Sequence, residues 1–397
     1  MELTNKQTIG LDLAIRRWKD GEKYTVIAGY AGTGKSTLVK FIISALSDYG
    51  IKPERDVAYA TFTGKAAEVL RKKGNPNAIT LHKLLYDHIP KANGGFLRKE
   101  KRNLEYKVVV VDEVSMVPKS MLDILLKHKI YVLFLGDPFQ LPMIDKKESH
   151  NLLDHPHIFL DEIMRQEAES EIIQLTMKIR NGEKIDFSNG KEVMVIPKKE
   201  LVTGHLLWAD QIICATNNTR ISINNQVRQL LGYEGLPKDG EKLICLRNYW
   251  DDISTNGNAA LVNGTTGIIK NAFENFRLVP MYIKIENHKV NFIQCDFIAD
   301  GGDEFTQVNM DKNMILTGEP CMTWKEAYNL NKYKKQLGEI VPKEFAFGYA
   351  ITCHKAQGSE YDNVLVIEES FPFDKEEHAR WLYTACTRAA NKLVLVR

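Results

Sequence analysis

The sequence has few cysteines, little net charge and no recurrent metal-ligand spacing. Its six cysteines form no Cys-x-x-Cys pair, which argues against a zinc ribbon and a disulfide framework. His150, His155 and His157 lack a nearby acidic or cysteine partner at such a spacing, so we interpret them as loop residues. Lys and Arg number 53 against 51 Asp and Glu, so any phosphate-binding surface has to be local.

Segments that could enter a membrane are also missing. No apolar run is long enough to span a bilayer, and the first ten residues lack the apolar stretch of a secretion signal. We therefore expect a cytoplasmic protein without a membrane partner. With 397 residues and 44% hydrophobic residues, the chain is expected to form two or three globular domains.

Short apolar runs alternate with helical patterns and predict an α/β fold. Runs at 24–28, 108–111 and 131–135, with helical stretches at 36–46 and 119–128, indicate a doubly wound parallel sheet. A second set of buried-strand runs predicts a second α/β domain, and short strand-like pieces between its parts predict a small β-barrel. The second set lies at 211–215, 364–368 and 393–396, and the barrel pieces are KLICLR, GTTGIIK, MYIKI and VNFIQC. The predicted divisions are 1–155, 156–239, 240–342 and 343–397.

The strongest motif is GYAGTGKS at 29–36, placed after a predicted strand and before a predicted helix. Such a loop wraps phosphates with backbone N–H groups, Lys35 would reach the β- and γ-phosphates of ATP, and Ser36 could ligate Mg²⁺. The alternative is an ordinary glycine-rich loop. The predicted nucleotide-binding residues here are Gly29, Ala31, Gly32, Thr33, Gly34, Lys35, Ser36 and Thr37.

Three further polar residues follow predicted strands. Asp112 and Glu113 end the run of four valines, where Asp112 would hold Mg²⁺ and Glu113 would orient water. Gln140, in GDPFQLP, could sense a γ-phosphate or the attacking water. The alternatives are a common surface Asp-Glu pair and a Gly-Asp turn that closes a strand.

Together these motifs resemble those of superfamily 1 helicases, and their particular residues are similar to those of the RecD/Dda-like branch. The resemblance also includes LTxxQ at 3–7, TFTGKAA at 61–67, TLHKL at 80–84, MRQ at 164–166, TCHKAQGS at 352–359 and YTACTRA at 383–389. It implies two RecA-like P-loop motor domains with an SH3-like β-barrel inserted in the second. It also implies a DNA helicase that hydrolyses ATP with Mg²⁺ and moves 5′ to 3′ on single-stranded DNA.

The resemblance assigns further site residues. Gln7 would read the adenine, although LTxxQ alone is more often a helix cap, and Gly358 would join the nucleotide site. Arg165 and Arg388 would be arginine fingers; the alternative for Arg165 is a surface helix arginine. Residues implied to contact the strand are Phe62, Thr63, Gly64, Lys65, His82, Phe96, Thr352, His354 and Lys355.

Two departures from the family pattern concern the strand-binding side. Phe62 stands where the family commonly has proline, which alters the local fit to the backbone, although an aromatic ring there could stack on a base. Met143 replaces the second proline of GDxxQLPP.

Two inserts also have counterparts in this branch. Residues 240–248 and 262–267 look like its SH3-like barrel, although a purely structural β-insert is the alternative. Residues 87–106 would form a β-hairpin pin, with Asn-Gly-Gly at its turn and Phe96 stacked on the last base pair. Alternatively, Phe96 packs this loop onto the first domain.

Three classes of function remain open. A translocating helicase explains both halves of the chain, and it would act as a monomeric motor at junctions of single- and double-stranded DNA with replication or repair proteins. A P-loop enzyme acting on a small molecule, such as a kinase, explains only the first half. A nucleic-acid-binding scaffold with a vestigial ATPase is the third, and the intact charged residues argue against it.

Overall fold

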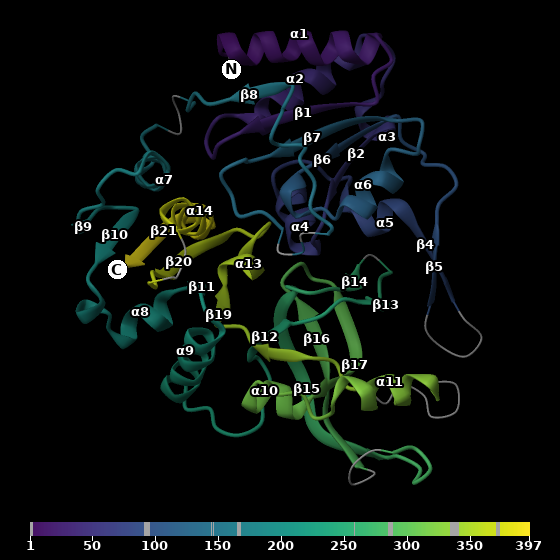
Figure 1. The fold of residues 1–397 in the computed structure, drawn as a ribbon, viewed down its shortest axis with the longest axis vertical. Coiled ribbons are helices and arrows are strands. Elements are labelled where there is room, and N and C mark those ends of the chain that lie inside the picture. The colour runs from purple at the N-terminus through teal and green to yellow at the C-terminus, as the bar shows by residue number, and fades with distance from the viewer. Residues whose placement is uncertain are drawn as a thin grey trace. The chain divides into compact units, whose positions relative to one another are not determined.

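The computed structural model describes residues 3–90, 96–143, 145, 147–164, 168–257, 259–284, 289–333, 341–370 and 374–397 (Figure 1). The chain divides into two compact units. The first unit holds Met1–Leu85, Lys101–Ala215 and Ala356–Arg397, and the second holds Tyr86–Glu100 and Thr216–Lys355. All six cysteines are free thiols. None of the helices in these described ranges has the length and apolar character that crossing a membrane needs.

The first unit contains an all-parallel sheet whose central strands are buried on both faces. Burial of both faces explains why these strands are continuous apolar runs, and it confirms the strands predicted from the sequence. From edge to edge the strands are β3 (Ala78–Thr80), β2 (Val57–Thr61), β6 (Val108–Val111), β7 (Tyr131–Gly136), β1 (Tyr24–Gly29) and β8 (Ile158–Leu160). The helical segments of this part are α1 (Asn5–Lys19), α2 (Lys35–Ser47), α3 (Pro53–Asp56), α4 (Gly64–Lys72), α5 (Leu81–Leu85), η1 (Val114–Met116) and α6 (Lys119–Leu125).

A second sheet in the first unit is built from late segments of the chain. Its strands pair in parallel except at β9, which is antiparallel to its neighbour and has both residues exposed. Within the first unit the order is β11 (Gln211–Cys214), β20 (Tyr361–Ile367), β21 (Ala389–Val396), β10 (Val193–Ile196) and β9 (Ser188–Asn189). The accompanying helices are α7 (Glu171–Asn181), η2 (Lys198–Glu200), α8 (Thr203–Trp208) and α14 (Lys375–Cys386). The prediction of strands at 211–215, 364–368 and 393–396 is confirmed.

The second unit is dominated by a five-stranded antiparallel sheet around its own apolar core. Its strands, in order, are β17 (Glu304–Asp311), β16 (Lys289–Ala299), β15 (Thr266–Leu278), β12 (Lys242–Cys245) and β18 (Phe345–Phe347). The unit also contains β13 (Tyr249–Ile253) paired with β14 (Ala260–Leu261), β19 (Ala350–Thr352), α9 (Asn217–Leu230), α10 (Lys312–Thr317) and α11 (Trp324–Lys332). The short helix α13 (Cys353–Ala356) lies where the chain passes back to the first unit.

Two local predictions, on segments that the structure groups in the second unit, have different outcomes. The predicted hairpin exists: β4 (Tyr86–Pro90) pairs antiparallel with β5 (Phe96–Glu100), and β5 lies against β13. The predicted strand MYIKI was wrong over its first four residues, which form turns and irregular backbone after Pro280. Ile283 is buried there in a small cluster with Val279, Val290 and Leu330, so burial under α11, rather than strand pairing, explains this apolar pattern.

A buried ion pair joins α9 to the start of β12. Arg228 Nε and Nη2 lie 2.8 and 3.0 Å from the two carboxylate oxygens of Glu241, and the exposed fractions of the two side chains are 8% and 0%. The guanidinium also lies over the ring of Phe347, 4.1 Å from its centroid.

We expect Arg228→Met to lower the free energy of unfolding by about 3–5 kcal/mol, because the Glu241 carboxylate stays buried without its counter-charge. Urea denaturation followed by circular dichroism measures this loss. Lys184→Met is the control: it breaks an ion pair with Asp186 whose two side chains are exposed, and the midpoint should not change. Equal midpoints for the wild type and Arg228→Met would contradict the expectation.

Candidate nucleotide site and nucleic-acid contacts

The glycine-rich loop lies between β1 and α2, as the sequence predicts. Gly34 has φ of 76°, and a Cβ there would come 2.5 Å from Gln7 Nε2, so this position requires glycine. Lys35 Nζ donates hydrogen bonds to Gly29 O and Tyr30 O, at 2.8 and 2.9 Å, and Ser36 is exposed in the first turn of α2. The lysine and the hydroxyl are therefore both placed at a helix N-terminus, where phosphate oxygens are stabilised.

Gln7 serves as a helix cap and also contacts this loop. Thr4 and Gln7 form a reciprocal capping box at the start of α1. The Gln7 side chain is buried, and its Nε2 lies 3.4 Å from both Thr33 O and Gly34 O. The two interpretations of LTxxQ are compatible, and adenine recognition by Gln7 stays a prediction.

Glu113, Gln140 and Arg388 meet in one cluster. With its amide oriented to satisfy its neighbours, Gln140 donates to Glu113 Oε2 at 3.1 Å and accepts from Arg388 Nη2 at 3.1 Å. Arg388 Nη1 lies 3.7 Å from Glu113 Oε1. The structure thus brings together three residues that the sequence predicted to be catalytic, from segments after β6, β7 and α14.

The backbone of Glu113 is strained where it presents this carboxylate. Its φ of 53° is in the left-handed region, which a residue with a Cβ rarely adopts and which costs roughly 1–3 kcal/mol. The Glu113 N–H donates to Asp112 Oδ1 at 2.8 Å and so stabilises the turn. The strained residue is therefore itself a member of the cluster of Glu113, Gln140 and Arg388.

The two neighbouring aspartates are electrostatically perturbed. Burial, together with the charge of Glu113, raises the pKa of Asp112 to about 6, while Lys35 opposes the rise. Burial also raises the pKa of Asp137, which accepts a hydrogen bond of 2.6 Å from the hydroxyl of Tyr383. A positive charge near Asp112 would therefore stabilise its ionised carboxylate.

Arg388 is almost fully buried, with an exposed fraction of 4%. Its guanidinium also donates to Thr384 O at 3.1 Å, Ser359 O at 3.3 Å and Thr387 Oγ1 at 3.2 Å. These bonds fix its orientation toward Glu113. The second predicted finger, Arg165, lies outside the described residues.

The first unit carries four of the predicted strand contacts near the end of β2 and a fifth on α5. Thr63 caps α4, which begins at Gly64, and its Oγ1 accepts from the Ala66 N–H at 3.2 Å. Phe62 is partly buried and packs against His82, with ring centroids 5.9 Å apart. His82 is only 5% exposed, so its ring packs under that of Phe62 and holds it in place.

Lys65 and Gly358 have other neighbours within the same unit. The Lys65 ammonium lies over the ring of Tyr361, 3.6 Å from its centroid. A Cβ on Gly358 would come 3.1 Å from Met116 Sδ and 3.5 Å from Thr63 Oγ1. A nucleotide contact by Gly358 stays a prediction, and Gly358 packs against the segments that follow β2 and β6.

The second unit carries the other predicted strand contacts. Thr352 ends β19, and His354 and Lys355 follow on α13, both partly buried. Burial lowers the pKa of Lys355 to about 8; Cys245 opposes this shift and Arg220 adds to it. Burial also lowers the pKa of His354. Phe96 lies on β5, and its side chain is outside what the structure describes.

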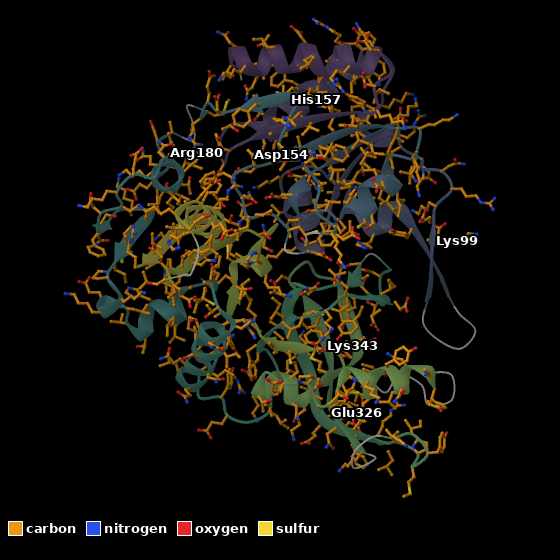
Figure 2. All side chains as sticks on the ribbon, in the orientation of Figure 1. Lys99, Asp154, His157, Arg180, Glu326 and Lys343 are labelled. Carbon is orange, nitrogen blue, oxygen red and sulfur yellow. The ribbon has the colours of Figure 1, made fainter. Side chains whose placement is uncertain are left out.

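Two contacts at the site were not foreseen from the sequence. Arg180, labelled in Figure 2, lies with its guanidinium carbon 3.8 Å from the centroid of the Tyr30 ring in the glycine-rich loop. The hydroxyl of Tyr383 accepts a hydrogen bond of 2.9 Å from the Ala31 N–H of the same loop. The motif YTACTRA was visible, but no residue pattern indicated that its tyrosine bonds to the glycine-rich loop.

Two of the three histidines near residue 150 have structural partners. His157, also labelled in Figure 2, accepts from the Val26 N–H at 2.9 Å through Nδ1, and His150 Nε2 lies 2.9 Å from Val114 O. Within the described ranges, no three His, Cys, Asp or Glu side chains gather as a metal group would require.

Two family matches cover different parts of the chain: the AAA domain family at residues 11–194, and the UvrD-like helicase C-terminal domain family at residues 347–396. The ATP-dependent RecD2 DNA helicase of Deinococcus radiodurans is 26% identical over 94% of this chain and 46% of its own length. The ATP-dependent DNA helicase dda of Enterobacteria phage T4 is 29% identical over 46% of this chain and 43% of its own. The chain thus covers less than half of each of these two relatives.

A solved structure supports the fold. The Pif1 helicase from Bacteroides, determined in complex with ADP-AlF3 and single-stranded DNA, aligns with 100% of this chain and 92% of its own, with a TM-score of 0.51 and 18% identity. The parallel sheets and the glycine-rich loop define a P-loop protein with RecA-like architecture. The two family matches and these relatives show that the chain is similar to RecD2- and Dda-type DNA helicases, in agreement with the resemblance noted in its motifs.

If Lys355 contacts a phosphate of single-stranded DNA, as the resemblance implies, we expect the affinity for that strand to fall as pH rises through about 8, because Lys355 then loses its proton. The log–log salt slope should become shallower by about 0.6 between pH 7 and pH 9, because about four fifths of one charge, worth about 0.7 in slope, is lost. Fluorescence anisotropy with a labelled oligothymidylate at several salt concentrations measures both quantities.

Lys355→Arg is the matched control, because arginine stays charged throughout this range. Its affinity and salt slope should not change between pH 7 and pH 9. A pH dependence in Lys355→Arg equal to that of the wild type would place the titrating group elsewhere.

Proposed function

We propose that the chain is an ATP-dependent DNA helicase that translocates on single-stranded DNA, 5′ to 3′, and couples hydrolysis to unwinding. The observation that carries the proposal is the cluster of Glu113, Gln140 and Arg388 in the same unit as the complete GxxxxGKS loop. A carboxylate, an amide and a buried guanidinium are the groups that phosphoryl transfer to water needs.

Each residue of the cluster has a distinct chemical task. Glu113 orients the attacking water and accepts its proton, and Gln140 holds the Glu113 carboxylate in place through its amide. Arg388 stabilises the negative charge that grows on the transferring phosphoryl group, an effect worth about 10³- to 10⁵-fold in rate. Lys35 neutralises the phosphates before the reaction.

The residues of the glycine-rich loop and of the acidic end of β6 fit a magnesium nucleotide. Ser36 and Asp112 offer the hard oxygen ligands that Mg²⁺ prefers, and Asp112 is a carboxylate whose raised pKa a divalent cation would lower. Mg²⁺, when bound, supplies charge neutralisation between the phosphates. Gln7 would contact the adenine, and Arg165 would be a second finger.

We further propose where DNA binds. Phe62, Lys65 and Lys355 would contact the strand, His82 would support Phe62, and the hairpin of β4 and β5 would act as the pin. The antiparallel sheet of β17, β16, β15, β12 and β18 would be the SH3-like barrel of this branch, inserted in the second motor domain. Support comes from the grouping of this hairpin with the sheet in one compact unit and from the contact of β5 with β13.

We expect Glu113→Gln to reduce ATP turnover at least about a hundredfold while single-stranded DNA binding is retained, because the amide keeps the shape and loses the proton acceptor. Lys35→Ala should lose turnover as well, and Glu22→Gln, which alters a surface pair with Arg17, should behave as the wild type. Phosphate release with and without oligonucleotide gives the rates.

The same assay separates the alternatives for the wild type. Strong stimulation by single-stranded DNA supports the motor. Turnover indifferent to DNA would indicate an enzyme acting on a small molecule, and DNA binding without turnover would indicate a scaffold.

Polarity is expected from the branch alone. Unwinding of a duplex with a 5′ single-stranded tail should be fast, and a duplex with a 3′ tail should stay intact under the same conditions. Strand separation that requires the 3′ tail would reverse the polarity and leave the ATPase assignment unchanged.

A further inference from the structure

The loop of residues 137–141, which carries Gln140, is bonded to α14. The Leu141 N–H donates to Thr384 Oγ1 at 2.9 Å, and Arg380 Nη1 donates to Pro138 O at 3.0 Å. These two hydrogen bonds, each to a backbone atom of the loop, thus fix the path of the loop along α14, the helix that precedes Arg388.

Tyr383 adds a bond to the glycine-rich loop. Its hydroxyl donates to Asp137 Oδ2 at 2.6 Å and accepts from the Ala31 N–H at 2.9 Å. The side chain is 1% exposed, and its ring packs edge-on against Phe139 with centroids 5.2 Å apart. In this buried site each bond is hard to replace with water, so the hydroxyl holds both loops in one arrangement.

We propose that Tyr383 is a positioning residue for ATP hydrolysis. Its hydroxyl sets the distance between the glycine-rich loop, the loop of residues 137–141 and the end of α14. Arg388 follows the C-cap of α14 and donates from Nε to Thr384 O at 3.1 Å, so a displacement of α14 moves Arg388 with it. The inference rests on the proposed function, because it assigns a role in that reaction.

The substitution that isolates the hydroxyl is Tyr383→Phe. Phenylalanine keeps the packing against Phe139 and removes the partner of Asp137 and of the Ala31 N–H. Misplacement of catalytic groups by about an ångström lowers rates by up to about 10²-fold. We expect kcat to fall at least about tenfold, while the KM for ATP and the Kd for single-stranded DNA change less than about threefold.

Tyr131→Phe is the matched control. Tyr131 is also a buried tyrosine of the first unit, and its hydroxyl makes two hydrogen bonds, with Thr25 Oγ1 at 2.6 Å and with Ala14 O at 3.0 Å. It should lower the unfolding midpoint and leave kcat unchanged. A purely structural role for Tyr383 would make the two variants alike.

A double mutant tests the bond to the carboxylate. If the Tyr383–Asp137 contact is what matters, Tyr383→Phe combined with Asp137→Asn should reduce kcat no more than the more damaging single variant does. Multiplied losses would show that the two residues act independently and would overturn the proposed contact.

Amide hydrogen exchange gives a readout that does not depend on activity. Peptides covering residues 29–36 should exchange faster in Tyr383→Phe than in the wild type and Tyr131→Phe, because the Ala31 N–H loses its acceptor. Unchanged exchange together with unchanged kcat would overturn the proposal. A wild type without DNA-stimulated turnover would instead overturn the proposed function, and the exchange measurement would still decide whether the Tyr383 hydroxyl holds the glycine-rich loop.

Discussion

A buried guanidinium has to be neutralised and fully hydrogen-bonded, and this requirement at Arg388 organises the first unit. An unpaired charge at 4% exposure would cost several kcal/mol, so the surrounding carbonyls, Thr387, Gln140 and Glu113 are part of the fold as well as of the site. Because these partners lie after β6, after β7, just before β20 and at the end of α14, satisfying one side chain fixes the relative positions of four segments. Displacing any one of these segments would leave the buried charge of Arg388 without one of its partners.

The strained backbone at Glu113 is explained by the same cluster. Its left-handed φ of 53° turns the chain immediately after β6, and the carboxylate then reaches Gln140 and Arg388. The bond from its N–H to Asp112 and the burial of Val114 hold the turn. Strain maintained at this point favours a catalytic role over a surface Asp-Glu pair.

The division of the chain into units does not follow the order of its motifs. The TCHKAQGS segment at 352–359 crosses from one unit to the other between Lys355 and Ala356, so this motif is itself a covalent connection between the two. Gln357, in the first unit, donates to Leu141 O at 2.6 Å, while Lys355 belongs to the second. This short motif thus makes a hydrogen bond to the loop that carries Gln140 near one end and has a predicted strand contact near the other.

The sequence by itself determined the parallel strands, the glycine-rich loop and the acidic strand end, because buried strands need continuous apolar runs and phosphate loops need glycines at fixed spacing. It also indicated that Gln140 and Arg388 matter. Only the tertiary structure decided which groups meet: the Tyr383 hydroxyl with the Ala31 N–H and the Asp137 carboxylate, Lys65 with Tyr361, and His82 with Phe62. The residues of each of these groups are distant in sequence, and local patterns carry no record of such distances. The failed strand at MYIKI has the same cause, since the burial of Ile283 with Leu330 depends on packing and leaves only an apolar residue in the sequence.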